Sequence, residues 1–252
     1  NSFSMIVLEK ELSKPYEMID MVTTPDGSLV AMVHCNNCTS DLNAWVNLFK
    51  EYQELLGIPV DMDELYGKLY NIALTGDTDC GGLLSYNYIS GEPVTGLAEG
   101  RPLFVRSAND KFNLANFMRA HLYASVGVLK IGNDILFNEE KIKVDRITGH
   151  GGLFRTKGVG QRVLAAAINS PISVMETAGE GGAWGIALLG AFLVNNDGKQ
   201  SLADFLDEYV FAGDAGVEVS PTAEEVEGFN TYIENYKAGL PIEEAAVRFK
   251  CY

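Results

Sequence analysis

The amino-acid sequence predicts one α/β domain that covers residues 1–252. Two observations carry this prediction. Three short apolar segments separated by turn residues open the chain, which is the pattern of β-strands. Further along, apolar residues recur every three or four positions in several stretches, and short apolar segments lie between these stretches, so helices and strands are expected to alternate.

The composition limits the class of protein. Of the 252 residues, 47% are hydrophobic and 21% are charged, so the chain has enough apolar content for a substantial core. The formal net charge is −15, and an acidic surface repels phosphate groups. We therefore expect no nucleic-acid partner and no membrane partner. The longest apolar run, residues 183–193, is too short to span a bilayer.

The beginning of the chain and its cysteines give two further expectations. The chain begins with Asn1 rather than Met and enters an apolar stretch almost at once, so we expect it to be part of a longer protein. Its four cysteines are few for this length, and no secretory signal is visible. Both observations favour reduced thiols in a cytoplasmic protein.

The predicted strands at the start of the chain are residues 3–8, 16–22 and 29–34. Pro25-Asp26-Gly27 is a turn signal between the last two, and we expect an antiparallel meander in which sequential strands are neighbours. A helix follows, because apolar residues take helical spacing at Leu42, Trp45, Val46, Phe49, Tyr52 and Leu56. Thr39 is its expected N-cap.

The second half of the chain predicts a strand over residues 144–148, the glycine turn Gly149-His150-Gly151-Gly152, a helix over residues 159–168 and a strand over residues 172–174. The next helix starts at Gly181-Gly182, and because it is apolar on every side we expect it to be buried. The remaining predicted elements are helices over residues 63–74, 114–132, 223–236 and 242–249, a strand over residues 81–88 and a loop over residues 90–107.

The glycine turn at residues 149–152 is the strongest local indication of a binding site. Glycines between a strand and a helix let the backbone approach a ligand closely, and the following helix offers free N–H groups to an anion. The turn is not a Walker A loop, since no Gly-Lys-Ser or Gly-Lys-Thr closes it, and its spacing is not that of a dinucleotide fingerprint. A purely structural turn is the alternative.

Positive charge gathers around this turn. Residues 141–162 contain six basic side chains, Lys141, Lys143, Arg146, Arg155, Lys157 and Arg162, against the single acid Asp145. In a chain with a net charge of −15, such a basic island attracts a small anion such as a nucleotide. A solvated helix face is the alternative interpretation.

Three other patterns are interpreted as structural. Gly181-Gly182 is preceded by Glu176 and Glu180, whose carboxylates would repel a phosphate, so this helix start suits close packing or the uncharged part of a nucleotide. Cys35-Asn36-Asn37-Cys38 lacks a second pair of ligands at workable spacing, and we expect a turn rather than a metal or redox site. His121 lies on an apolar helix face and is expected in the core.

Five segments, taken in order, carry a resemblance to a known family. They are Gly81-Gly82-Leu83 to Ser90-Gly91-Glu92; residues 117–124 with Arg119-Ala120; Thr148-Gly149-His150-Gly151-Gly152-Leu153 with Gln161 and Leu164-Ala165; Glu180 with Gly185-Ile186-Ala187; and Ser201-Leu202 with Pro221, Phe229, Tyr232 and Tyr236. Together they resemble the C-terminal domain of the FGGY carbohydrate kinases. Within that family the xylulose kinases are most similar, followed by the ribulose kinases.

The resemblance implies a ribonuclease H-like, actin-type ATPase domain in which a mixed sheet is flanked by helices. It also implies that ATP, with Mg²⁺, binds from the cleft side, and that the purine lies near Gly151, Gly152 and Leu153. Thr156 stands where the family carries Asn, and Ser40 stands where it carries Gly at the start of the Trp-bearing helix. Both are expected to line the same nucleotide site.

The resemblance further implies that this chain is the nucleotide-side half of a kinase. The family's sugar pocket, first phosphate loop and general-base Asp precede the matching region, so we assign no catalytic residue and no metal ligand within the chain. The implied partners are the N-terminal kinase domain of the same protein and a sugar substrate, with a homodimer as an implied assembly. The implied reaction transfers the γ-phosphate of ATP to a ketopentose such as xylulose; alternatives are a kinase of ribulose, gluconate or glycerol, or a non-catalytic actin-like nucleotide-binding module.

Overall fold

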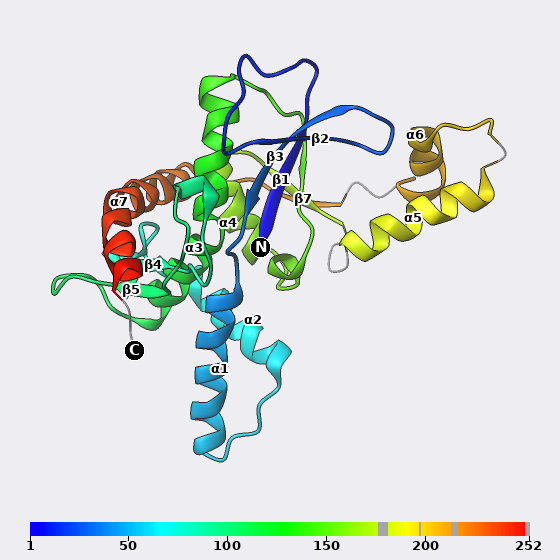
Figure 1. Ribbon diagram of the computed structural model, residues 1–252. Coiled ribbons are helices and arrows are strands. Elements are labelled where there is room, and N and C mark those ends of the chain that lie inside the picture. Colours follow the sequence, from blue (N-terminus) through cyan, green and yellow to red (C-terminus); the bar gives the residue numbers. More distant parts are fainter. Residues whose placement is uncertain (176–180, 197, 213–215, 250–252) are drawn as a thin grey trace.

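The computed structural model describes residues 1–175, 181–196, 198–212 and 216–249, and Figure 1 shows its ribbon. Within these residues, short strands fall into three small sheets, and helices pack around and between them. The predicted α/β class is therefore confirmed. No helix in these described ranges is both long enough and apolar enough to cross a membrane.

The first sheet is antiparallel and contains β1 (Ser2–Val7), β2 (Asp20–Thr23) and β3 (Leu29–Cys35) in the order β1-β3-β2. The predicted meander is wrong, because β1 pairs with β3 and not with β2. The reason lies in burial: Ala31 and Val33 of β3 are fully buried, whereas β2 has no buried residue. The most apolar strand takes the centre of the sheet, and β2 takes an edge.

Helix α3 (Leu114–Asp134) is the centre of the core and is buried along most of its length. It packs against β1 and β3, and it also contacts helices on its other sides. Gly132 lets β3 approach closely, since a Cβ at this position would overlap the side chain of Val33. Asn113 caps the start of the helix, because its side chain accepts a hydrogen bond from the Asn116 N–H at 2.9 Å. The helix predicted in this region is confirmed.

Helices α1 (Ser40–Leu55) and α2 (Met62–Ala73) pack on each other; α2 also packs on α3, and α1 projects from the body (Figure 1). The apolar stripe of α1 is buried only near its start: Leu42 is 1% exposed, whereas Tyr52 is 60% exposed. Thr39 occupies the N-cap position as predicted, although its side chain makes no capping hydrogen bond. The first turns of α1 are therefore anchored in the core, while its far end lies in solvent.

A second sheet beside α3 consists of the antiparallel strands β4 (Leu84–Tyr86) and β5 (Leu103–Val105). β4 is a shorter version of the strand predicted over residues 81–88. β5 lies within the stretch predicted as a loop, because three apolar residues among glycines and prolines give no periodic signal. Pairing with β4 makes this short segment a strand.

The third sheet is mixed and contains β6 (Ile147–Thr148), β7 (Ile172–Val174) and β8 (Val217–Val219). β6 and β7 are parallel and are connected through α4 (Val159–Ile168), while β8 is antiparallel to β7. The predicted bounds of α4 and β7 are confirmed. Gln161 of α4 donates hydrogen bonds to a carbonyl oxygen of β7 at 3.1 Å and to one of β8 at 2.7 Å, so α4 fixes the spacing of these strands.

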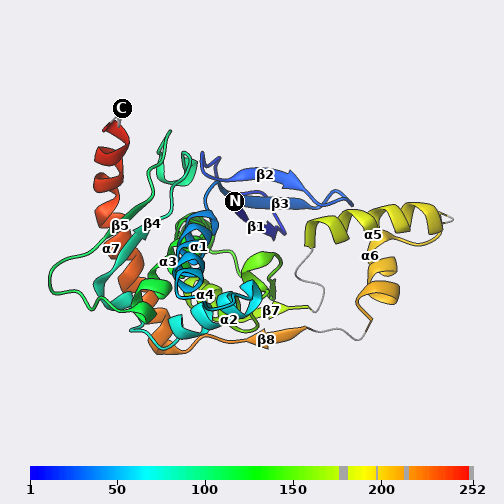
Figure 2. The ribbon, with the colours of Figure 1, turned by 90° about the horizontal axis from the view of Figure 1, so that it is seen from below.

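Helix α5 (Gly181–Asn195) leads into α6 (Leu202–Phe205) and the π-helical turn η6 (Leu206–Val210), and this segment projects away from the body (Figures 1 and 2). The expectation that α5 is buried is wrong: Ile186 is 68% and Leu193 is 80% exposed. Aromatic rings of α5 contact rings within and just after α6 and η6. A sequence that is apolar all round favours burial, but the segment that packs on α5 is too small to cover it.

Helix α7 (Ala223–Arg248) runs beside β4 as one continuous helix, so the prediction of two separate helices is wrong. Its start is fixed by a capping box in which Thr222 and Glu225 each accept a hydrogen bond from the other's N–H. Its buried side chains include Phe229, Tyr232, Ile233 and Tyr236. Full burial of one large apolar side chain contributes about 1.5–3 kcal/mol. Several of them outweigh the cost of about 3 kcal/mol that Pro241 imposes inside a helix.

His121 of α3 is a core residue, as predicted, and is 1% exposed. Its Nδ1 lies 2.9 Å from the Ser85 Oγ and 3.6 Å from a carboxylate oxygen of Asp41. The rings of Trp45, Phe104 and Phe117 surround it. This serine, histidine and aspartate are all buried, so their arrangement is part of the core and not a hydrolytic site. Burial lowers the pKa of His121 to about 3, so its imidazole is neutral in the folded protein.

We predict that His121 makes the protein sensitive to acid. The unfolded chain takes up a proton at this side chain below its ordinary pKa of 6.5, whereas the folded chain does so only near a pKa of about 3. Stability is therefore lost as the pH falls between these values, by up to about 1.4 kcal/mol per pH unit. In His121→Gln this contribution is absent, so the free energy of unfolding should fall less steeply with acid in urea titrations.

His34→Gln is the matched control, because His34 lies in β3 outside this aromatic cluster. The control should keep the acid dependence of the wild type. An unchanged acid slope in His121→Gln would show that His121 is protonated in the folded core, contrary to its burial.

Candidate functional site

The glycine turn lies at the carboxyl end of β6. β6, α4 and β7 form a parallel β–α–β unit, and the Gly149 N–H extends the ladder by donating to the Ser173 carbonyl at 2.8 Å. In α/β sheets, ligands bind outside the carboxyl ends of parallel strands. The turn therefore occupies the end of this sheet that suits a ligand.

The glycines of the turn have different roles. A Cβ on Gly149 would lie 2.5 Å from the ring of Phe154, so Gly149 allows the turn to pack on that ring. Gly151 has a φ of 109°, which other residues adopt only with strain. Gly152 lies outside the positive-φ region, and apart from its two neighbours in the chain no residue has a heavy atom within 4 Å of the place where its Cβ would be. The space beside Gly152 is therefore open to a ligand.

Helix α4 begins at Val159, as predicted, and therefore does not start directly after the glycine turn. The 3₁₀ turn η4 (Gly152–Phe154) comes between them, and Gly158 precedes α4 in the left-handed conformation. A Cβ on Gly160 would overlap the carbonyl of Leu153, so the first turn of α4 packs on η4. Helix α4 therefore contributes less directly to anion binding at the glycine turn than a helix that began at the turn itself would.

The sequence-predicted contact residues fall into two groups. Gly151, Gly152, Leu153 and Thr156 lie in one continuous turn, in which Gly152 is exposed and the other three are partly exposed. Ser40 is exposed and is the first residue of α1. It belongs to a different element from the other four, so its place in the same site stays a prediction.

A second glycine-rich helix start lies beside the turn. A Cβ on Gly181, the first residue of α5, would lie 2.8 Å from the Cβ of His150. The glycine turn after β6 and the first residue of α5 therefore meet at this point. Glu176 and Glu180, which were expected to keep phosphate away from this helix start, lie outside the described residues.

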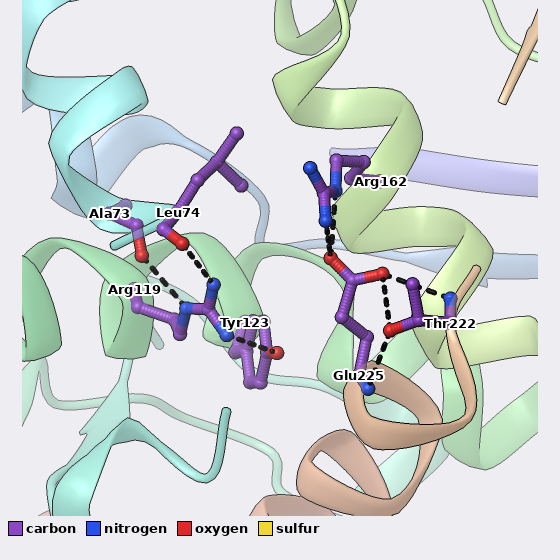
Figure 3. A network of polar contacts seen from close by, with 7 residues as sticks. All are labelled: Ala73, Leu74, Arg119, Tyr123, Arg162, Thr222 and Glu225. Atoms are coloured by element: carbon purple, nitrogen blue, oxygen red, sulfur yellow. Dashed lines mark hydrogen bonds and ion pairs between the residues drawn. The ribbon is translucent and has the colours of Figure 1, made fainter. Parts of the chain in front are cut away.

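Fewer basic side chains of the island are available to an anion than the sequence indicates. Arg162 directs both Nε and Nη2 to one oxygen of Glu225 at 2.7 Å, which links α4 to α7 (Figure 3). Arg146 and Arg155 are also engaged in interactions within the protein. Within the described ranges, Lys141, Lys143 and Lys157 are exposed and form no ion pair. These three lysines are the part of the island that remains available to a bound anion.

The ion pair between Arg162 and Glu225 belongs to the frame of the site. Burial acts to raise the pKa of Glu225, but the hydrogen bonds from Thr222 and the charge of Arg162 outweigh it and hold this pKa below its usual range. Arg162 is partly exposed, so the pair itself contributes at most about 1 kcal/mol. Its role is to fix the orientation of α4 relative to α7.

A polar cluster behind α4 did not stand out in the sequence. Arg119 is 4% exposed, and its guanidinium donates to two carbonyl oxygens at the end of α2 at 2.8 and 3.0 Å (Figure 3). A cavity of about 10 Å³ lies between Arg119, Tyr123, Arg162 and Glu225. It has room for about one water molecule, so it is not a nucleotide pocket. Arg119 itself was the only indication of this cluster in the sequence, because the carbonyl groups that it binds lie at the end of α2, far away along the chain.

The Cys-x-x-Cys segment connects β3 to α1 and holds a neighbouring loop. Asn37 donates through its N–H and Nδ2 to the Glu92 carboxylate at 3.2 and 3.1 Å. Burial raises the pKa of the Cys35 and Cys38 thiols, which disfavours the thiolate that metals and disulfide exchange require. Within the part of the chain that the structure describes, no group of three or more His, Cys, Asp or Glu side chains is placed to hold a metal. The absence of a metal at these cysteines stays a prediction.

Comparison with solved structures shows the fold. The xylulose kinase from Rhodospirillum rubrum is similar with a TM-score of 0.67 and 17% identity over 95% of this chain and 45% of that chain. The gluconate kinase from Lactobacillus acidophilus has a TM-score of 0.67 and 18% identity, with coverages of 97% and 46%. The glycerol kinase from Plasmodium falciparum, solved with ADP, has a TM-score of 0.62 and 16% identity, with coverages of 99% and 46%. The chain thus spans less than half the length of these kinases.

Comparison with protein families gives the family. A search of curated proteins finds no match to the sequence. The model of the C-terminal domain of the FGGY family of carbohydrate kinases matches residues 2–194, which includes the first sheet, α3, the glycine turn and all of α5 except its last residue. The chain therefore belongs to the FGGY family of carbohydrate kinases and carries the C-terminal domain of that family.

Proposed function

We propose that this chain is the ATP-side domain of a carbohydrate kinase and that the purine of ATP lies on the turn over residues 149–156. The observation that carries the proposal is the open space beside Gly152 at the carboxyl end of β6. Gly151 and Gly152 let the nucleotide approach the backbone, and Leu153 and Thr156 line the base. The exposed amine of Lys157 supplies positive charge next to this turn.

The proposed fold of the domain is ribonuclease H-like and of the actin type. Antiparallel strands come first, and α4 then connects the parallel strands β6 and β7, which supports this assignment. The order β1-β3-β2 departs from a simple meander, as described above. Ser40 at the start of α1 is proposed as a further contact to the nucleotide.

The proposed reaction is an in-line phosphoryl transfer. A sugar hydroxyl oxygen attacks the γ-phosphorus of ATP, and the bond between this phosphorus and the β–γ bridging oxygen breaks. ADP leaves with the electron pair of that bond, and the hydroxyl proton passes to an Asp carboxylate. That Asp is assigned to the N-terminal half of the kinase. When Mg²⁺ is bound, it neutralises charge on the phosphates. The described residues contain no group of ligands placed for a metal, so we derive no step of this chain through Mg²⁺.

The proposed acceptor is a ketopentose such as xylulose, and the proposed partner is an N-terminal kinase domain of the same protein. Two similar structures are a xylulose kinase and a gluconate kinase, and a third is a glycerol kinase, so these acceptors are the alternatives. We further propose that the kinase is cytoplasmic and forms a homodimer. A non-catalytic nucleotide-binding module is the alternative from another class.

We predict that Gly152→Val weakens ADP binding at least tenfold, or by about 1.4 kcal/mol. The valine side chain would fill the open space in which the purine is proposed to lie, while the φ of Gly152 and the lack of neighbours allow the substitution without strain. Isothermal titration of ADP into the chain and into the complete kinase measures the effect.

Gly67→Ala is the matched control, because a Cβ at Gly67 of α2 also meets no atom within 4 Å. This control should leave ADP affinity at the wild-type level. It should raise thermal stability slightly, because Ala is about 1 kcal/mol more favourable than Gly inside a helix. If Gly152→Val binds ADP as tightly as the wild type, the purine does not lie on this turn.

We predict that the chain alone does not phosphorylate a sugar. Transfer requires a held acceptor, a base and charge stabilisation on both sides of the phosphoryl group. Loss of a general base alone costs about 10²–10⁴-fold, and loss of the acceptor pocket adds to it. ADP release is measured with xylulose, ribulose, gluconate and glycerol, and the complete kinase is the positive control. Sugar-dependent turnover by the purified chain would place the active site within it.

A further inference from the structure

Glu243 of α7 carries a carboxylate that is removed from solvent. Its side chain is 0% exposed, and Oε1 accepts a hydrogen bond from the Arg101 N–H at 2.6 Å. Oε2 is buried and has no hydrogen-bond partner among the described residues. An ionised carboxylate in this position would leave a buried oxygen unsatisfied, which is costly, whereas a protonated one carries no net charge.

Arg101 holds the end of the same helix. Its Nε donates to the Ala246 carbonyl at 3.4 Å, and its Nη2 donates to the Phe249 carbonyl at 3.0 Å. Carbonyl groups at a helix C-terminus have no partners within the helix, so a guanidinium there stabilises the last turn. Arg101 and Glu243 therefore join the end of α7 to the loop that precedes β5.

The last turns of α7, residues 242–248, depend on this junction. Pro241 has no N–H to donate, so the hydrogen-bond ladder of the helix is interrupted immediately before them. The apolar side chains in this segment contribute little burial, since Ile242 is 46% exposed and Phe249, just after the helix, is 67% exposed. Segments with few buried contacts open at lower free energy than the rest of a fold.

We propose that Glu243 is a proton-dependent latch that holds residues 242–248 of α7 against the loop at Arg101. With the proton bound, the side chain is neutral and the latch is closed. When the proton leaves, a negative charge remains in a buried position, and opening the segment returns that charge to water.

The charged and titratable groups that interact with Glu243 support opening of the segment on loss of the proton. Arg101 in the loop acts on Glu243 through its N–H and its charge, and the charge of Glu243 acts on Tyr86 of β4 and on Tyr88 after β4. Burial raises the pKa of Glu243 to about 7, and the Arg101 N–H and charge oppose this shift without cancelling it. Burial also raises the pKa of Tyr86 to about 12, with the charge of Glu243 adding to the shift, and the pKa of Tyr88 moves in the same direction. Both tyrosines are therefore neutral where Glu243 titrates.

The direction in which stability changes with pH follows from the two states of Glu243. Its pKa is about 7 when buried and 4.5 when exposed, so the buried state binds its proton more tightly. The stabilisation is complete below pH 4.5 and is lost as the pH rises through about 7. Within this interval the opening equilibrium constant should increase by up to about tenfold per pH unit.

Hydrogen exchange tests the latch. Protection factors for the amides of residues 243–248, corrected for the intrinsic exchange rates, are measured from about pH 5 to about pH 8.5. We expect the protection in the wild type to fall across this range and then level off. Glu243→Gln carries a neutral isostere of the closed latch, so its protection should stay constant and exceed that of the wild type above pH 7.

Glu244→Gln is the matched control, because its side chain is 50% exposed on the same helix, and it should follow the wild type. The carboxyl ¹³C shift of Glu243 gives an independent reading in the wild type and should titrate near pH 7. Constant protection in the wild type, or a carboxyl titration below pH 5, would overturn the proposal.

Discussion

The structure depends on the burial of α3, which has almost no face in solvent. Every element around it must therefore present a surface that fits. β3 approaches at Gly132, and α7 approaches at Gly127, where a Cβ would lie 3.4 Å from the Ile233 side chain. Because these contacts involve backbone and small side chains, α3 fixes the distances between the first sheet, α7 and the helices beside it. Arg119 adds the end of α2 to the same frame.

This frame determines where the glycine turn lies. α4 packs on α3, and Gln161 and Arg162 in its first turn bind the mixed sheet and α7, respectively. Each neutral hydrogen bond contributes only about 0.5–1.5 kcal/mol, so their main effect is on position. The turn after β6 is held at both of its ends, by the β6–β7 ladder and by α4. A ligand at Gly152 would thus meet a backbone that is already in place, which reduces the entropy cost of binding.

Features that neighbouring residues determine could be predicted from the sequence. Features that depend on contacts between distant segments could not. The bounds of α4 and β7 follow from a local stripe and from local turns. The glycine turn was noticed from its own sequence, but contact of Gly151 and Gly152 with a nucleotide stays a prediction. The strand order was not predictable, because it depends on which strand α3 covers. The exposure of α5 was missed because periodicity reveals an apolar helix but not its partner. The pairing of Arg162 with Glu225 was missed because these residues are far apart in the sequence.

The central claim is that a nucleotide binds at the carboxyl end of β6. The most direct measurement is an amide NMR titration of the ¹⁵N-labelled chain with ADP, which maps the site without any substitution. The largest shift changes should fall on residues 149–156 and on Gly181, which lies against His150, while the amides of α2 around Gly67 stay unchanged. Saturable changes that cluster elsewhere, with residues 149–156 unaffected, would contradict the claim.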